Sequence, residues 1–161
     1  MARHIWSVLC SRSIIDKESN QVTLVAVAEK LVIELLQPIP AGEEKLMFPY
    51  QMELVSLWER TEPAPELATV RIRFIAPNGA ELAEQTVPIE LTDRRFRSTF
   101  KFEALPIVGD GFCQTIVYLV NEGVFEEVAR IPLEIQIKPP AIPAPRKTHS
   151  SKKTSRKTLL P

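Results

Sequence analysis

The chain has 161 residues, of which 45% are hydrophobic and 25% charged, which predicts one globular domain rather than a fibrous or disordered protein. Two cysteines exclude a disulfide framework, and no stretch approaches the roughly 18 uninterrupted apolar residues of a membrane span. The formal net charge is zero, but six of the 20 basic residues lie at 146–161, where no acidic residue occurs, so residues 1–145 hold 14 basic against 20 acidic residues.

The N-terminal run MARHIWSVLCSRS is too short and too broken by polar residues for a signal peptide. We therefore expect a cytoplasmic protein with reduced thiols and no membrane contact.

Period-two alternation of apolar and polar residues is the strongest local signal. It predicts strands near 4–11, 22–36, 48–60, 68–76, 84–91, 94–103, 112–120 and 126–138. The run at 21–37 also fits a helical stripe through Leu24, Leu31 and Leu35, but its many β-branched residues favour one long or bulged strand. Alternation elsewhere is clearer, as in Val70, Ile72 and Phe74 against intervening arginines.

Glycine and proline mark the breaks between these runs. Asn78-Gly79 predicts a hairpin turn in which the glycine takes a positive φ. Pro88 and Pro132 interrupt two strand-like runs, and proline is tolerated only at edges, bulges or strand starts. We therefore expect these two runs to be edge strands.

Short strands at this spacing, without a convincing long helix, predict an all-β fold: an antiparallel β-sandwich of about eight strands. Its domain should span residues 1–138. The proline-rich run PPAIPAP follows as a linker, and residues 146–161 have no apolar pattern, so 139–161 should form a linker and a basic disordered tail.

The chain contains one Gly-Asp-Gly, at 109–111. A phosphate-binding loop would lead into a helix N-terminus, but the residues after Gly111 alternate as a strand. A calcium loop needs several oxygen ligands, and Asp110 is the only one of the chain's three aspartates in this loop. The motif is therefore predicted to be a turn that feeds a strand.

The stretch RFRSTFKFEAL followed by DGFCQTIVYLV resembles the later strands of immunoglobulin-like sandwiches, with Phe112 in place of the tyrosine of the usual corner. Over 1–138 the chain is also similar to a family of small uncharacterised bacterial domains, through IWSVLCSRSIIDKESNQVTLVAVAEKLVIEL and PNGAELAEQTVPIEL. These resemblances imply a small immunoglobulin-like or C2-like β-sandwich and supply no catalytic residues.

Side chains that could carry chemistry are scattered. His4 and His149 lack metal-ligand spacing, and a zinc or catalytic site with Cys10 and Cys113 would need convergence that the sequence does not indicate. The pairs Glu43-Glu44 and Glu126-Glu127 fit a solvated surface, and Trp58 fits the core better than a ligand platform. We therefore expect no enzyme, catalytic residue, cofactor or metal.

Two groups of basic residues remain. The strand faces could form a patch if their strands are neighbours, although an ordinary charged sheet face is the favoured interpretation; these residues are Arg71, Arg73, Arg94, Arg95, Arg97 and Lys101. The tail could contact nucleic acid or an acidic partner through Arg146, Lys147, Lys152, Lys153, Arg156 and Lys157. The sequence thus predicts a non-enzymatic binding or adaptor module for another protein, with weak, non-specific nucleic-acid association through the tail as the alternative.

Overall fold

The computed structural model describes residues 2–36, 45–121 and 123–140, and in these ranges the chain is all-β. No helix there is long and apolar enough to cross a membrane. The strands are β1 (Ala2–Ile15), β2 (Val22–Val27), β3 (Lys30–Glu34), β4 (Leu46–Phe48), β5 (Met52–Arg60), β6 (Glu66–Ile75), β7 (Glu81–Leu91), β8 (Arg95–Phe102), β9 (Leu105–Ile107), β10 (Gly111–Asn121) and β11 (Val124–Lys138).

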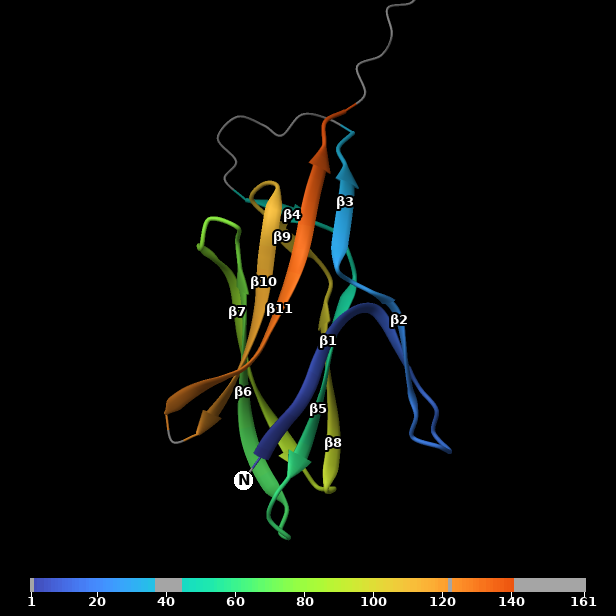
Figure 1. Cartoon of the computed structure of the whole chain (residues 1–161), viewed down its shortest axis with the longest axis vertical. Coiled ribbons are helices and arrows are strands. Elements are labelled where there is room, and N and C mark those ends of the chain that lie inside the picture. The colour runs from blue at the N-terminus through green and yellow to red at the C-terminus, as the bar shows by residue number, and fades with distance from the viewer. Residues whose placement is uncertain (1, 37–44, 122, 141–161) are drawn as a thin grey trace, which may run out of the picture.

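These strands form two large sheets and one small one (Figure 1). Sheet A has the order β2-β1-β5-β8, sheet B has the order β3-β11-β10-β6-β7, and β4 pairs with β9. Every pair is antiparallel except β3 with β11, which run parallel. The expected purely antiparallel arrangement is wrong at this one pair, because β3 reaches sheet B by a crossover and not by a hairpin.

All eight expected strand regions contain strands, but the described chain has eleven of them. Two extra strands, β4 and β9, have three residues each. The third arises because 21–37 is neither a helix nor one long strand. At its middle the Ala28 N–H donates to the Leu9 carbonyl of sheet A, while the Glu29 carbonyl accepts from Glu134 of sheet B. The two halves of this segment therefore belong to different sheets.

Sheets A and B share one hydrophobic core. Sheet A contributes Met52, Leu54 and Trp58, and sheet B contributes the inner faces of β6, β10 and β11. The predicted buried face of residues 68–76 is confirmed, since Val70 and Ile72 lie in this core. Alternation places one face of each strand inward, which is why the sequence could identify these residues.

The predicted turns are confirmed. Gly79 has a φ of +85° and its N–H donates to the Ala76 carbonyl, closing the β6–β7 hairpin. The Gly-Asp-Gly motif leads directly into β10, and the Asp110 carboxylate accepts a hydrogen bond from the Ile137 N–H near the end of β11. A Cβ on Gly111 would lie 2.9 Å from the Pro77 Cβ, so this glycine permits a close approach of two turns.

The edge-strand prediction is confirmed for the run with Pro88 and wrong for the run with Pro132, because β11 lies between β3 and β10 in sheet B. Pro88 lies in β7, the edge strand of sheet B. Pro132 lies in β11 before the pairing with β3, which begins at Glu134. Residues 124–133 of β11 thus form described strand pairs only with β10.

Strand β1 bends sharply, and its two halves pair with different strands. Residues up to Cys10 pair with β5, and residues from Cys10 onward pair with β2 (Figure 1). The β1–β2 hairpin then returns to the outer face of sheet A. There the Ser13 N–H donates to Glu53 over 2.7 Å, and Arg97 donates to Asn20 over 3.3 Å. The bend therefore leaves residues 2–8 of β1 with a described strand partner only on the β5 side.

Candidate functional site

A mainly apolar groove of about 480 Å³ lies beside the segment that crosses between the sheets, where β1 faces β11. Its apolar lining comes from Val8 and Leu9 of β1, Val27 of β2, Ala28 of the crossover, Phe112 of β10, and Ile131 and Pro132 of β11. Glu29 and Glu134 lie at its border. We refer to this feature as the apolar groove.

Large apolar side chains beside this groove are exposed to solvent. Phe112 is 62% exposed and Val27 is 52% exposed, although both are lining residues. Val25 and Ile14 are also exposed, and they lie on the same face of the β1–β2 hairpin according to its register. Contiguous exposed apolar surface on a soluble protein marks an interaction site more often than scattered single residues do.

The backbone edges along the groove are poorly suited to pairing with another strand. The Glu134 N–H points toward Glu29, away from β10. Residues two apart in a strand direct their N–H groups to the same side, so the side of β11 away from β10 lacks a donor at Pro132. On the facing strand the register with β5 shifts between His4 and Trp6, as at a β-bulge. Prolines and bulges protect sheet edges from strand addition, so contacts here should involve side chains.

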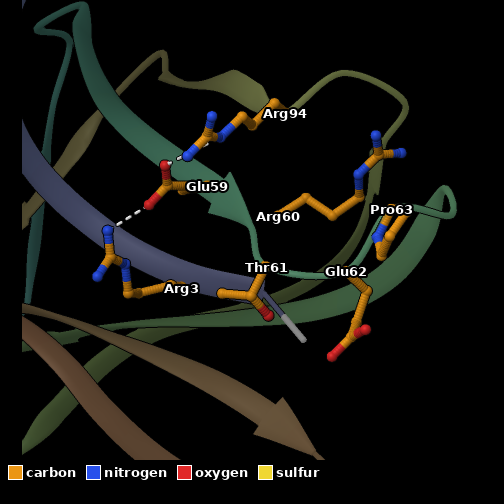
Figure 2. Close-up of a pocket in the computed structure, with 7 residues that line it drawn as sticks. All are labelled: Arg3, Glu59, Arg60, Thr61, Glu62, Pro63 and Arg94. Carbon is orange, nitrogen blue, oxygen red and sulfur yellow. Dashed lines mark hydrogen bonds and ion pairs between the residues drawn. The ribbon is translucent and has the colours of Figure 1, made fainter.

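A charged depression of about 500 Å³ lies at one end of sheet A, lined by three arginines (Figure 2). Glu59 is nearly buried and forms ion pairs with Arg3 and, over 3.6 Å, with Arg94. The third arginine, Arg60, extends away from Glu59 and donates to the Leu91 and Thr92 carbonyls. Glu59 therefore neutralises part of this positive charge, and Arg60 fastens β5 to the β7–β8 connection.

A row of serines crosses the inner face of sheet A. Ser7, Ser56 and Ser98 occupy equivalent positions on β1, β5 and β8. The Ser7 hydroxyl lies 2.8 Å from Nε2 of His4 and 2.7 Å from the Ser56 hydroxyl, while the Trp58 Nε1–H donates to Ser98. The row supplies hydrogen-bond partners to polar groups inside the core.

His4 and Ser7 resemble a base and a nucleophile in spacing, and sequence reasoning missed this pair. Residues i and i+3 of a regular strand face opposite sides, but the register shift between His4 and Trp6 brings both side chains inward. Burial lowers the pKa of His4, which favours the neutral ring. Among the described residues no carboxylate accepts a hydrogen bond from His4, so the third member of a triad has no counterpart there.

The surroundings of the two cysteines do not favour a reactive thiolate. Both are free and buried. Burial raises the pKa of Cys113 to about 11, and burial together with the nearby Glu53 carboxylate raises that of Cys10. Thiols held in the protonated form are poor nucleophiles and poor metal ligands.

The conjectured arginine patch across two strands does not form, because Arg71 and Arg73 lie on β6 of sheet B whereas Arg94, Arg95, Arg97 and Lys101 lie on or next to β8 of sheet A. Arg71 pairs with Glu84 and Arg73 with Glu81 and Glu84, as on an ordinary charged sheet face. The basic tail residues Arg146, Lys147, Lys152, Lys153, Arg156 and Lys157 lie outside the described residues, as does the pair Glu43-Glu44.

Two other sequence predictions can be placed. Glu126 and Glu127 are exposed, and Glu127 pairs with Arg130 over 2.7 Å, which lowers the pKa of this carboxyl. Trp58 is fully buried and makes a T-shaped contact with the His4 ring, so its packing role is confirmed. In the described part of the chain, no three His, Cys, Asp or Glu side chains cluster in a way that could hold a metal ion.

No family model and no curated protein sequence matches this chain. Solved structures show distant similarity. A glycosyl hydrolase family 2 member from Bacteroides cellulosilyticus is 13% identical with a TM-score of 0.46, over 55% of this chain and 13% of that one. The alkylpurine DNA glycosylase AlkC of Pseudomonas fluorescens, bound to DNA with an abasic site analog, is 16% identical with a TM-score of 0.40, over 65% and 27%.

The C-terminal domain of Wzt is 13% identical with a TM-score of 0.41, over 84% of this chain and 73% of that one. The chain thus spans only small parts of the first two proteins. All three TM-scores lie below 0.5, so they transfer neither a fold family nor an activity to this chain.

Proposed function

We propose that this chain is a non-enzymatic binding module, an immunoglobulin-like β-sandwich that docks another protein at the apolar groove. The observation that carries the proposal is the exposure of Phe112 and Val27 on the walls of that groove. Leaving such side chains in water forgoes about 25 cal/mol for each Å² of apolar area, which a partner protein would recover by covering them.

The partner inserts an apolar side chain between Phe112 and Val27. It makes few backbone hydrogen bonds to β11, because Pro132 and the bulge of β1 protect the two facing edges. Free, buried thiols at Cys10 and Cys113 support a location in the reducing cytoplasm.

The test is affinity capture from the native host with the full chain and two matched variants. Phe112→Ser removes an exposed aromatic side chain from the groove, and Leu67→Ser removes a 77% exposed side chain from β6. We expect one set of proteins to be retained by the native chain and by Leu67→Ser and lost with Phe112→Ser. Equal retention by both variants would rule out the groove as the docking site.

The alternative is weak nucleic-acid association through the tail, favoured by six basic residues without an acidic one at 146–161. Binding to duplex DNA should then ignore sequence and weaken with salt, with a log–log slope no steeper than about −5, from roughly 0.9 per phosphate contact. Replacing the six tail residues by serine in the full chain should abolish this binding. Undiminished binding by that variant would exclude the tail as its cause.

A further inference from the structure

The outer face of sheet A carries a dense group of arginines at the end opposite the β4–β9 pair. Strand register places Arg3, Glu59 and Arg95 in one row across β1, β5 and β8. The next row consists of Trp6, Leu57 and Arg97. We call this group the arginine cluster; its members are Arg3, Arg94, Arg95 and Arg97.

Acidic residues balance only part of this charge. The same surroundings contain Glu59, Glu62 and Asp93, so positive charge is in excess. Arg3 and Arg94 both pair with the Glu59 carboxylate (Figure 2). Their side chains nevertheless remain 63% and 84% exposed. Arg95 is exposed and forms no ion pair with another described residue.

The apolar part of the second row adds a different kind of contact. Trp6 is partly exposed and lies on the outer face, because its neighbour Ser7 points inward to Ser56. Leu57 lies beside it and Arg97 follows on β8. Alternate residues of β8, such as Arg95 and Arg97, are about 7 Å apart, so their side chains leave the strand on the same face. The Arg97 guanidinium donates to Asn20 of the β1–β2 hairpin.

We propose that this face binds single-stranded nucleic acid, with phosphates held by the arginine cluster and a base stacked on Trp6. Planar guanidinium groups match phosphate oxygens in pairs, and a single strand exposes the base faces that an aromatic ring can stack on. The proposal goes beyond the groove, because it places a second partner on another surface. It also differs from the tail alternative, because all its residues belong to the folded domain.

The test uses the full chain and a fluorescent single-stranded oligonucleotide of about 15 nucleotides, titrated at several salt concentrations. The variant Arg94→Gln/Arg95→Gln removes two phosphate contacts. The control Arg73→Gln/Arg130→Gln changes the total charge equally on the outer face of sheet B. We expect the log–log salt slope of the first variant to be shallower by about 1.4, at roughly 0.7 per contact for a single strand. The control should retain the native slope.

Tryptophan emission gives a second readout, because Trp58 is fully buried whereas Trp6 is partly exposed and can report on a bound base. Bound oligonucleotide should quench this emission, and Trp6→Leu should abolish the quenching. Equal weakening by both arginine pairs would overturn the proposal in favour of non-specific attraction. Two results would overturn the choice of single-stranded nucleic acid as the ligand. One is that an acidic peptide binds as tightly as the oligonucleotide, and the other is that duplex DNA binds as tightly without quenching the emission.

Discussion

Thr115 on β10 carries a hydroxyl that the core does not satisfy. The residue is fully buried, and its Oγ1 has no hydrogen-bond partner among the described residues. Its neighbours across the strands are Phe74 and Ile131, which offer no polar side-chain group. We therefore expect Thr115→Val, which replaces the hydroxyl with a methyl group of similar size, to stabilise the protein.

The expected gain follows from the cost of desolvating an unpaired hydroxyl. Mutational data place that cost at about 1–3 kcal/mol. Threonine and valine both favour strands, so strand propensity does not decide the outcome. Some repacking around the new methyl group will offset part of the gain. We therefore expect the free energy of unfolding to rise by about 1–2 kcal/mol, equivalent to roughly 3–6 °C in Tm.

Urea titration followed by tryptophan fluorescence measures this difference, with an unchanged m value as the sign that only stability has changed. Thr99→Val is the matched control, since Thr99 is partly exposed on the outer face of β8 and its replacement should stay within about 0.5 kcal/mol. A loss of stability in Thr115→Val would refute the reasoning, because it would mean that the hydroxyl is satisfied in solution.

Four further outcomes are expected. Burial lowers the pKa of His4, so the free energy of unfolding should be highest above about pH 6.5 and should decrease as the pH falls from there toward the folded-state pKa. Urea midpoints measured across this pH range should show the decrease, and His4→Gln should remove it. With its pKa near 11, Cys113 should react with a thiol reagent only as fast as the chain unfolds. Gly111→Ala should lower stability by more than 1 kcal/mol or so, since its φ is +129° and its Cβ would meet Pro77. Deleting residues 139–161 should leave Tm nearly unchanged, because a proline-rich linker and basic tail are expected to bury little apolar area; a fall of many degrees would show that the segment docks on the domain.

Strand faces were predictable from sequence because alternation is a local property. Val70 and Ile72 could be assigned to the core without knowing which strands flank them. The same holds for Gly79, whose turn depends on four adjacent residues. Burial of a strand residue and the conformation of a tight turn therefore do not depend on the order of strands in the sheets.

Features that depend on strand order could not be predicted. Arg3 and Arg95 are separated by more than ninety positions and become neighbours across Glu59 only because β1 and β8 both pair with β5. The pairing of His4 with Ser7 needs a register irregularity that leaves no clear mark in the sequence. The split of 21–37 between two sheets escaped for the same reason, since its two halves have equally strand-like composition.

The parallel pairing of β3 with β11 joins positions that are 104 residues apart, as in the contact between Lys30 and Glu134. Pairings of such long sequence separation raise the contact order and slow folding, since a large loop must close before the contact forms. During synthesis β3 must wait for β11, the last described strand, to leave the ribosome. Until then the edge of β3 and the apolar residues beneath it have no partner, and uncovered strand edges of this kind favour aggregation of a nascent chain.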